Sequence, residues 1–339
     1  MSMTLPMFDR TALLALVERF SRQRIIMLGD LVADESVYGE IARVSREAPV
    51  LILKERDRQV APGGGANAAN NLAALGAHVT PVGAVGKDES GDALLHYFRE
   101  RQISTRHIVR VNHYLTPTKT RILGGLSHWQ RQQIVRIDRE PAHPLAAETR
   151  TSLTRAAAAL LASTTGLLVA DYGYSTTNAK EVDSLRRRAI RHALPITIDS
   201  RYDLPTYKSL TAATPNEPEL EAAFGQSIGN DLERLHTLGR KFLRRQELQA
   251  LLVTRGRDGM VLFEPRRPPR HFPIFGSDQA VDVTGAGDTV IAAFTLALAA
   301  GASFLEAALI ANCAGGIVVM KRGTATVSRG EITEAIRNA

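Results

Sequence analysis

Short apolar runs that each end at a small or acidic residue recur along the chain. Four of them span residues 25–28, 167–170, 196–198 and 251–253. Between them lie segments with helical periodicity, such as 181–192 and 231–245. This alternation of short buried strands with amphipathic helices predicts a mostly parallel sheet covered by helices on both faces. Ligands bind such sheets at the carboxyl ends of the strands, where the polar residues that follow these runs fall.

Two longer segments depart from this alternation. Residues 37–60 and 113–138 contain β-branched or alternating stretches and show little helical period. We expect a small sheet, formed by about residues 36–61 and 112–138, that covers the strand ends as a lid. Because no internal repeat or linker is visible, we expect residues 1–339 to form a single domain. The N-terminal residues 1–24 are expected to form an amphipathic helix and not a leader segment.

The composition is that of a globular protein and excludes disordered and fibrous classes. The chain has 339 residues, of which 44% are apolar and 23% charged. Its one cysteine, Cys313, cannot form a disulfide within the chain, which fits a reducing compartment, so we expect a cytoplasmic protein. The uncharged stretch 289–305 is short for a membrane span and is interrupted by Gly301 and Ser303, so no membrane association is expected.

The net charge of +7 suits an anionic small molecule as well as a nucleic acid. The basic residues are dispersed over several predicted helices, which is typical of solvated helix faces. Aromatic residues make up only 5% of the chain, so there is little to stack on bases. We therefore expect a small-molecule ligand and no nucleic-acid partner.

The strongest chemical signal is the segment 282–289. Gly285, Ala286 and Gly287 lead into Asp288 at the entrance of a predicted helix. Small residues leave the backbone N–H groups open there, and the helix dipole favours the charge of a phosphate. Asp288 is thus a candidate base that accepts a proton from an attacking hydroxyl. Taken alone, the motif equally fits a glycine turn in which Asp288 stabilises the helix N-terminus.

Two weaker motifs contain residues suited to a polyol. Gly63 and Gly64 allow close backbone approach to a ligand, and Asn67 offers both a donor and an acceptor for sugar hydroxyls. A flexible connection is the alternative. Asp30 and Asp34 follow a strand and could accept hydrogen bonds from a polyol, while turn or cap roles are equally compatible.

Asn216 and Glu219 form a further pair with two interpretations. An amide and a carboxylate at a strand end could organise Mg²⁺ through water, but the same spacing is that of a helix capping box. Other chemistries find no support, since Walker A, Gly-x-Gly-x-x-Gly, His-Glu-x-x-His and Cys-x-x-Cys patterns are missing. The nine histidines show no metal-ligand spacing, and three of them are expected at the surface: His107, His113 and His128.

Together, these motifs resemble those of a known family. Their order and approximate spacing are similar to the ribokinase-like, PfkB-type carbohydrate kinases over nearly the whole chain. The motifs are Asp34, Gly63-Gly64 with Asn67, Asn216 with Glu219, 254–256 and 282–288. Within that family the chain most resembles the D-glycero-β-D-manno-heptose-7-phosphate kinases, on the segments 43–50, 132–138, 171–172 and 321–328.

The resemblance implies a ribokinase-like three-layer α/β/α sandwich with a mostly parallel central sheet and a small β-sheet lid. It implies transfer of the γ-phosphate of ATP to a sugar hydroxyl with Mg²⁺. For the heptose kinases, the acceptor is the anomeric hydroxyl, and the 1,7-bisphosphate lies on the route to ADP-heptose for lipopolysaccharide. Some members bind a monovalent cation near the loop of Asp282, which stays open here.

The family's site residues carry over by motif. Asp288 would be the base, with Gly285, Ala286 and Gly287 as the anion hole. The residues implied to hold the sugar or its phosphate are Asp34, Gly63, Gly64, Asn67, Arg121, Arg136 and Asp171. The residues implied to face the nucleotide are Asn216, Glu219, Thr254, Gly256 and Asn312, with Glu219 also near Mg²⁺ through water.

One departure leaves the acceptor open. Heptose kinases usually have a small residue and a lysine after the Asp-Tyr pair, where this chain has Gly173 and Tyr174. The lost lysine removes a phosphate contact unless Arg121, Arg136 or Arg201 replaces it. A PfkB-type kinase for another sugar or sugar phosphate is the alternative, and a non-catalytic sugar- or nucleotide-binding regulator is disfavoured by the intact Asp288 loop. The strand edges of the lid leave a homodimer through the lid open.

Overall fold

The chain forms a large main sheet and a smaller second sheet. The computed structural model describes residues 9–125, 132–277 and 279–339, and in these the main sheet has nine strands in the order β13-β12-β11-β10-β9-β8-β1-β4-β5. Their bounds are β1 Arg24–Gly29, β4 His78–Gly86, β5 His107–Val111, β8 Gly166–Asp171, β9 Ile196–Ser200, β10 Ala212–Ala213, β11 Ala250–Thr254, β12 Met260–Phe263 and β13 Arg270–Phe272.

The pairing of these strands is mostly parallel, as predicted. β1 pairs in parallel with β4 on one side and β8 on the other, and the parallel pairing continues from β8 to β11. Only β12 and β13, at one edge, are antiparallel to their neighbours. The four predicted apolar runs lie in β1, β8, β9 and β11. Because parallel strands share one direction, the polar residues after β8, β9 and β11 meet at one edge of the sheet.

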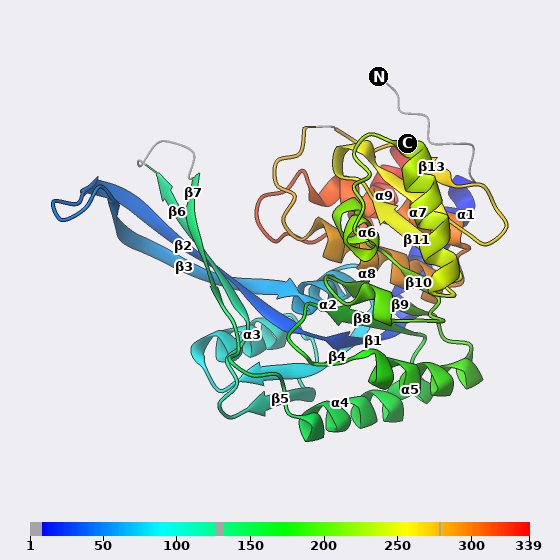
Figure 1. Cartoon of the computed structure of the whole chain (residues 1–339), viewed down its shortest axis with the longest axis horizontal. Coiled ribbons are helices and arrows are strands. Elements are labelled where there is room, and N and C mark those ends of the chain that lie inside the picture. The colour runs from blue at the N-terminus through cyan, green and yellow to red at the C-terminus, as the bar shows by residue number, and fades with distance from the viewer. Residues whose placement is uncertain (1–8, 126–131, 278) are drawn as a thin grey trace.

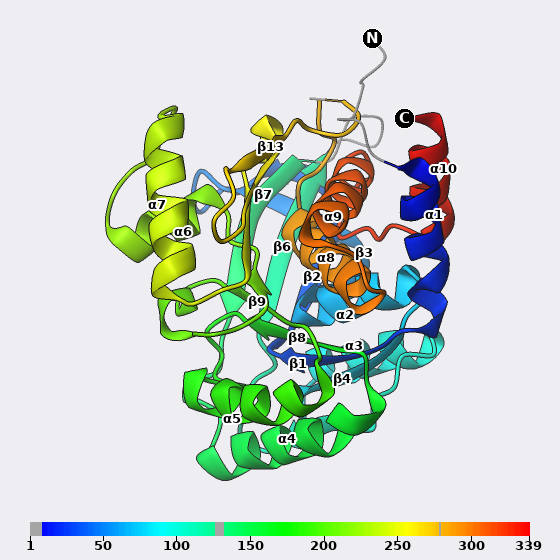
Figure 2. The same ribbon diagram turned by 90° about the vertical axis from the view of Figure 1, so that its right-hand side faces the viewer.

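Helices cover both faces of this sheet (Figures 1 and 2). One apolar core lies beneath the first set of helices: α1 Arg10–Glu18, α2 Gly65–Ala74, α3 Glu89–Glu100, α8 Ala286–Ala299, α9 Phe304–Val318 and α10 Arg329–Asn338. A second core lies beneath the other set: α4 Ala147–Leu160, α5 Ala179–Ala189, α6 Glu217–Phe224 and α7 Leu232–Arg245. The predicted three-layer α/β/α sandwich is confirmed.

A smaller sheet extends from this body (Figure 1). Its four strands, in the order β3-β2-β6-β7, are β2 Leu31–Val44, β3 Leu51–Gly64, β6 Thr118–Gly125 and β7 Gln132–Arg139. The predicted lid segments thus form a sheet, whose strands reach further toward the body than predicted, since β2 begins at Leu31 and β3 ends at Gly64. Part of the second predicted segment, 126–131 with His128, lies outside the described residues.

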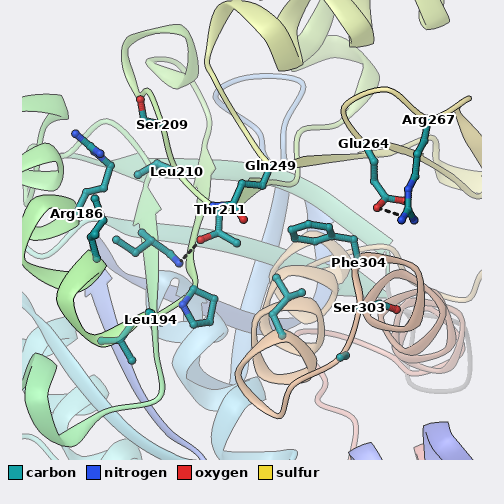
Figure 3. A pocket seen from close by; sticks show the side chains of 16 residues that line it. Arg186, Leu194, Ser209, Leu210, Thr211, Gln249, Glu264, Arg267, Ser303 and Phe304 are labelled. Carbon is teal, nitrogen blue, oxygen red and sulfur yellow. Dashed lines mark hydrogen bonds and ion pairs between the residues drawn. The ribbon is translucent and has the colours of Figure 1, made fainter.

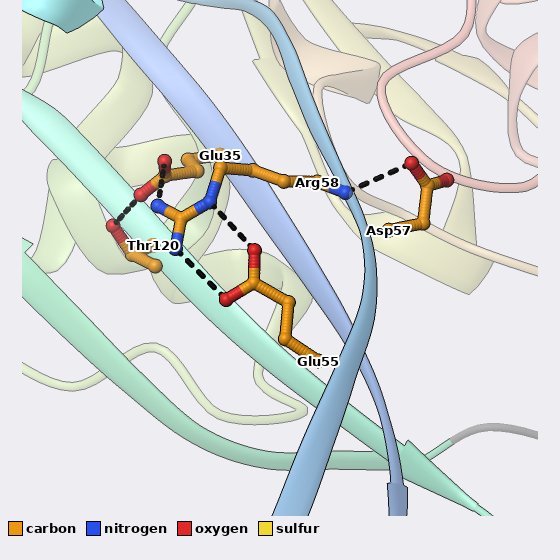
Figure 4. A network of polar contacts seen from close by, with 5 residues as sticks. All are labelled: Glu35, Glu55, Asp57, Arg58 and Thr120. Carbon is orange, nitrogen blue, oxygen red and sulfur yellow. Dashed lines mark hydrogen bonds and ion pairs between the residues drawn. The ribbon is translucent and has the colours of Figure 1, made fainter.

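A polar network joins three strands of the lid (Figure 4). Arg58 on β3 donates to Glu35 on β2 at 2.7 Å and makes two 3.1 Å bonds to Glu55. The hydroxyl of Thr120 on β6 donates to the other oxygen of Glu35 at 2.6 Å. The guanidinium of Arg58 lowers the pKa of the exposed Glu55. Because Glu35 is buried and bonded from both sides, it holds β2 in register between β3 and β6.

Within residues 9–24, the N-terminal segment contains one α-helix and a 3₁₀ turn before β1. The predicted helix over residues 1–24 begins at Arg10, where Asp9 caps it, ends at Glu18 and is followed by a 3₁₀ turn. Residues 1–8 lie outside the described part of the chain. None of the described helices combines the length and the apolar character that crossing a membrane requires.

Candidate active site

Asp288 lies in the first turn of α8, close to the carboxyl ends of β8 and β9. Its carboxylate is 6% exposed and has two donors from other elements. The side-chain amide of Asn67 on α2 donates to one oxygen at 2.7 Å, and the hydroxyl of Tyr172, after β8, donates to the other. Gly285 takes a positive φ of 75°, and a Cβ there would lie 2.5 Å from the Asn67 amide nitrogen. A glycine is therefore required where the loop passes Asn67.

The amide of Asn67 is directed at Asp288, which differs from the predicted sugar contact. Its oxygen accepts from Asn71 at 3.1 Å, and Asn71 in turn accepts from the hydroxyl of Thr289 at 2.9 Å. Asn67 is fully buried. This chain of bonds joins α2 to α8 and orients Asp288, and a contact of Asn67 with the sugar stays a prediction.

The surroundings of Asp288 make it basic. Burial raises the pKa of its carboxyl to about 7, and the nearby charges of Asp199 and Asp34 act in the same direction. The hydrogen bonds from Tyr172 and Asn67 oppose the rise. A carboxylate with a pKa near neutrality can accept a proton from a hydroxyl and still be ionised at physiological pH.

The backbone beside Asp288 offers free donors. The N–H of Ala286 donates to the carbonyl of Val283 at 3.2 Å. Within the described chain, no acceptor is bonded to the N–H groups of Gly287 and Asp288. Unpaired N–H groups at a helix start form an anion-binding site. Of the predicted anion hole, the Gly287 amide is thus open, whereas the amide of Ala286 is occupied.

Asp34, Gly63 and Arg121 meet on the lid side of the site. Arg121 Nη1 on β6 lies 3.0 Å from one oxygen of Asp34 on β2, and Thr324 donates to the other at 3.3 Å. A Cβ on Gly63 would lie 2.9 Å from the Asp34 carboxyl carbon, so the glycine admits this buried carboxylate. Gly64 has a positive φ of 52° at the start of α2.

Lys119 is a site residue that the sequence analysis missed. It pairs with Asp34 across the parallel β2–β6 contact, and its Nζ lies 5.7 Å from the centroid of the Tyr172 ring. Burial lowers its pKa, as do the positive charges of Arg201 and Arg136. Among the described residues, no carboxylate lies within ion-pair distance of its ammonium group. The alternation of buried Thr118 and Thr120 along β6 is the signal that places Lys119 on the site face with Arg121.

Asn216 and Glu219 form the capping box of α6. The N–H of Glu219 donates to the Asn216 side chain at 2.8 Å, and the N–H of Asn216 donates to the Glu219 carboxylate at 2.9 Å. The helix capping box, which was the alternative interpretation of this pair, is therefore present. Burial raises the pKa of Glu219. Thr254 bridges to Asn216, so the two strand ends lie side by side. At Gly256, with a φ of 54°, the space beyond the Cα is open.

Three other predicted contacts are engaged within the protein. The buried carboxylate of Asp171 accepts from Ser200 at 2.9 Å and from Tyr207 at 2.8 Å, so it holds the end of β8, and its contact with a sugar stays a prediction. The amide of Asn312 donates to the carbonyl of Pro273 at 2.8 Å. Arg136, on the exposed β7, pairs with Asp138 at 2.8 Å.

Asp30 has a structural role at the same strand ends. Its buried carboxylate accepts the backbone N–H groups of Tyr172, Tyr174 and Thr176 at 2.8, 2.9 and 3.0 Å. It therefore shapes the loop after β8, as the turn alternative for Asp30 predicted.

Two cavities lie at opposite ends of the sheet. A cavity of about 690 Å³ (Figure 3) is lined by residues that precede β9 to β11, among them Pro195, Thr211 and Gln249, and so lies at the amino ends. A smaller one of about 360 Å³ is lined by Tyr172, Tyr174 and Tyr202. Because Tyr172 also contacts Asp288, the smaller cavity adjoins the candidate site.

Side chains that commonly bind metal ions do not cluster in the described residues. In residues 9–125, 132–277 and 279–339, no three or more histidine, cysteine, aspartate or glutamate side chains gather in a way that could hold a metal ion. Cys313 is buried, and burial raises the pKa of its thiol to about 12.

Comparisons with known proteins agree with this geometry. A family model described as pfkB family carbohydrate kinase matches residues 27–329. The Bifunctional protein HldE of Pelobacter propionicus is 36% identical over 329 residues, which are 97% of this chain and 66% of that protein. HldE of Aeromonas salmonicida is 38% identical over 319 residues, which are 94% of this chain and 64% of that protein. The chain thus spans about two thirds of the length of these relatives.

Solved structures share the fold. Arabidopsis thaliana ribokinase, complexed with ribose and ATP, has a TM-score of 0.69 at 19% identity and covers 93% of this chain and 99% of its own. Phosphofructokinase-2 from Escherichia coli, in complex with substrates and products, has a TM-score of 0.72 at 16% identity, with coverage of 93% and 98%. These likenesses confirm the ribokinase-like fold. Because the family model spans most of the chain and the HldE proteins are similar along nearly all of it, the chain belongs to the pfkB family of carbohydrate kinases and is a sugar kinase, a phosphotransferase with an alcohol group as acceptor.

Proposed function

We propose that this kinase transfers the γ-phosphate of ATP to a sugar hydroxyl that Asp288 deprotonates. The observation that carries the proposal is a buried carboxylate, with a pKa near 7, beside two unpaired N–H groups at the start of α8. The hydroxyl loses its proton to Asp288 as its oxygen attacks the phosphorus, and the bond from phosphorus to the bridging oxygen of ADP breaks. The N–H groups of Gly287 and Asp288 stabilise the charge on the transferred group.

The chain offers matching positions for ATP and Mg²⁺. Gly287 supplies an open N–H for a phosphate, and the space beyond Gly256, which follows β11, is open. Only one oxygen of Glu219 is bonded in the capping box, so the other remains able to accept from a water of hydrated Mg²⁺. The ion, when bound, would neutralise phosphate charge. A monovalent cation near Asp282 remains a prediction, and replacing K⁺ by tetramethylammonium in the assay tests it.

The proposed acceptor is D-glycero-β-D-manno-heptose 7-phosphate, phosphorylated at its anomeric hydroxyl to the 1,7-bisphosphate. Lys119 supports a phosphorylated acceptor because its half-buried ammonium group has no carboxylate partner in the described chain and lies near Arg201 and Arg136. Arg136 is paired with Asp138, so Lys119 and Arg201 carry the positive charge that suits a phosphate dianion. They substitute for the lysine that is replaced by Tyr174. The similarity to the HldE proteins also supports this acceptor. Another sugar phosphate is the second candidate, favoured by the tyrosine-lined cavity at Tyr174.

A lid-mediated homodimer and a cytoplasmic location complete the proposal. Exposed apolar side chains gather on the lid strands and their connecting turn, among them Val44, Val50, Ile134, Val135 and Ile137. An open sheet edge with apolar neighbours favours pairing with a second copy. The cytoplasm supplies the ATP that the reaction consumes.

The test is an acceptor panel. The protein is mixed with ATP, Mg²⁺ and free or phosphorylated sugars, ADP is assayed, and the product is identified by ³¹P and ¹³C NMR. The proposal predicts the fastest turnover with heptose 7-phosphate and a new phosphate on the anomeric carbon. Much faster turnover of another sugar would reject the heptose assignment, and no ADP formation with any sugar would reject the kinase reaction.

A further inference from the structure

The hydroxyl of Tyr172 lies between the buried carboxylate of Asp288 and the partly buried carboxylate of Asp199. It donates to Asp288, and it lies 3.2 Å from an oxygen of Asp199 at the end of β9. The backbone N–H of Tyr172 is held at 2.8 Å by Asp30, so the tyrosine is fixed where it stands. No motif in the sequence indicated this contact, which joins the candidate base to a second acid.

The number of hydrogens shared by Tyr172, Asp199 and Asp288 limits their possible protonation states. A phenol has one hydrogen, so Tyr172 can donate to only one carboxylate at a time. Burial raises the pKa of Tyr172 well above its usual value, so the hydroxyl keeps its hydrogen at neutral pH. The carboxyl group that does not receive this hydrogen has two possible states. It is protonated and donates to the phenol oxygen, or it is an anion that faces the lone pairs of that oxygen. Two neighbouring buried carboxylates are not both ionised without a large cost.

The surroundings decide which acid holds the proton. Asp288 receives the amide of Asn67 and lies at a helix N-terminus with Lys119 near it, and these favour its anion. Within the described residues, Asp199 has no hydrogen-bond partner except Tyr172. The groups that face Asp199 are the acids Glu219 and Asp171, opposed by Arg201. The groups that face Asp288 are Tyr172, Asn67, Asp199, Asp34 and Lys119.

We propose that Tyr172 is a positioning residue that joins Asp199 and Asp288 into one proton-sharing unit, with the resting proton on Asp199 and with Asp288 kept ionised as the base. This inference rests on the proposed function of Asp288. In the reaction, the acceptor's O–H bond breaks, its oxygen bonds to phosphorus, and its proton goes to Asp288. The proton on Asp199 is not consumed. Burial raises the pKa of Asp199 to about 7, and the charges of Glu219 and Asp171 act in the same direction.

Three variants test the arrangement through the pH profile of kcat/KM, measured with the fastest acceptor of the panel. In Asp199→Asn, the amide donates to the phenol oxygen and the hydroxyl still donates to Asp288, but the neighbouring acid is gone. Because Asp199 carries the resting proton and is uncharged, the neutral amide leaves the charge beside Asp288 unchanged, and the acid limb should stay within about 0.3 units of the wild type. In Tyr172→Phe, Asp288 loses a donor, so the acid limb should shift to higher pH by about one unit.

Tyr207→Phe is the matched control. It also removes a buried phenol that donates to an aspartate, here Asp171, but it leaves Asp288 and Asp199 untouched. Its acid limb should coincide with that of the wild type. A shift of the limb to lower pH by about one unit in Asp199→Asn would show that Asp199 is ionised and would refute the resting proton on Asp199. A limb in Tyr172→Phe that moves no more than in Tyr207→Phe would refute the role of Tyr172.

A second measurement needs no substrate. In protein labelled with ¹³C at the aspartate carboxyls, the NMR titration should show a lower step at Asp288 and a higher step at Asp199, and the higher step should disappear in Asp199→Asn. Loss of the lower step in Asp199→Asn would contradict the inference. These two steps without turnover of any sugar would instead refute the proposed function and leave the pairing of the two acids intact.

Discussion

At the scale of single residues, the site depends on a few polar side chains whose bonds point inward. Asn67 and Tyr172 give the carboxylate of Asp288 a donor on each oxygen, so its orientation is set before a ligand arrives. Preorganised groups do not have to reorient during the reaction. The same burial that raises the pKa of Asp288 should lower the free energy of unfolding when the acids of this site are ionised.

The cost of the buried acids should appear as a pH-dependent stability. Because the folded pKa of Asp199 is raised from 3.8 to about 7, the folded state binds its proton more tightly than the unfolded state does. The free energy of unfolding therefore falls as the pH rises from about 4 to about 7, and the loss persists above it. Asp199→Asn removes the ionisation and should be more stable than the wild type at pH 8, by up to about 4 kcal/mol.

Urea unfolding at pH 5 and pH 8 measures this difference. The gain of Asp199→Asn should be larger at pH 8 than at pH 5. Asp203→Asn, at an exposed position, is the control and should show the same stability as the wild type at both pH values. A gain that is equal at the two pH values would contradict the raised pKa.

At the scale of elements, the sequence predicted what local periodicity encodes. The strands β1, β8, β9 and β11 follow from short apolar runs, and α5 and α7 follow from the helical spacing of their apolar residues. The position of Asp288 at a helix start could be predicted because the glycines and the acid of its motif are continuous in the chain. The lid sheet was predicted, but the ends of its strands were not. β2 and β3 remain paired as far as the residues where β2 follows β1 and β3 leads into α2.

Contacts between distant elements could not be predicted in the same way. Lys119 reaches the site only through the β2–β6 register, and Tyr172 meets Asp199 only because β8 and β9 are neighbours. Asn67 was assigned to the sugar because its amide suits hydroxyls, and Asp171 was assigned to it from the family resemblance. Their partners inside the protein depend on the packing of α2 on α8 and on the loops after β8 and β9, which no local pattern encodes.

The lid strand β6 yields a prediction for substrate affinity. Lys119→Met keeps the length of the side chain and removes its charge, so a phosphorylated acceptor loses one cationic contact. The KM for that acceptor should rise roughly 10- to 100-fold, with kcat within about threefold of the wild type. Lys54→Met, an exposed lysine on β3, is the control and should leave both constants unchanged. A normal KM for Lys119→Met would remove Lys119 from the acceptor site.

At the scale of the whole molecule, the lid projects from a body whose sheet is covered on both faces (Figure 1). The proposed dimer would cover the lid's apolar side chains and the open edges of β3 and β7. Light scattering coupled to gel filtration should give twice the chain mass of 36.9 kDa. Val135→Lys should shift the protein toward the monomer, because it buries a charge in the proposed interface. Ile190→Lys, exposed on the body, should not.

A monomeric wild type at micromolar concentration would contradict the dimer without affecting the catalytic account, because the contacts described around Asp288 all come from one chain.

The central claim is that Asp288 removes the acceptor's proton, and single-turnover kinetics of Asp288→Asn test it most directly. The asparagine can accept from Asn67 and donate to Tyr172, so the packing is preserved while the base is lost. The account predicts a rate of phosphoryl transfer lower by roughly 10²- to 10⁴-fold, with the affinity for the sugar retained. Transfer within tenfold of the wild-type rate would contradict it.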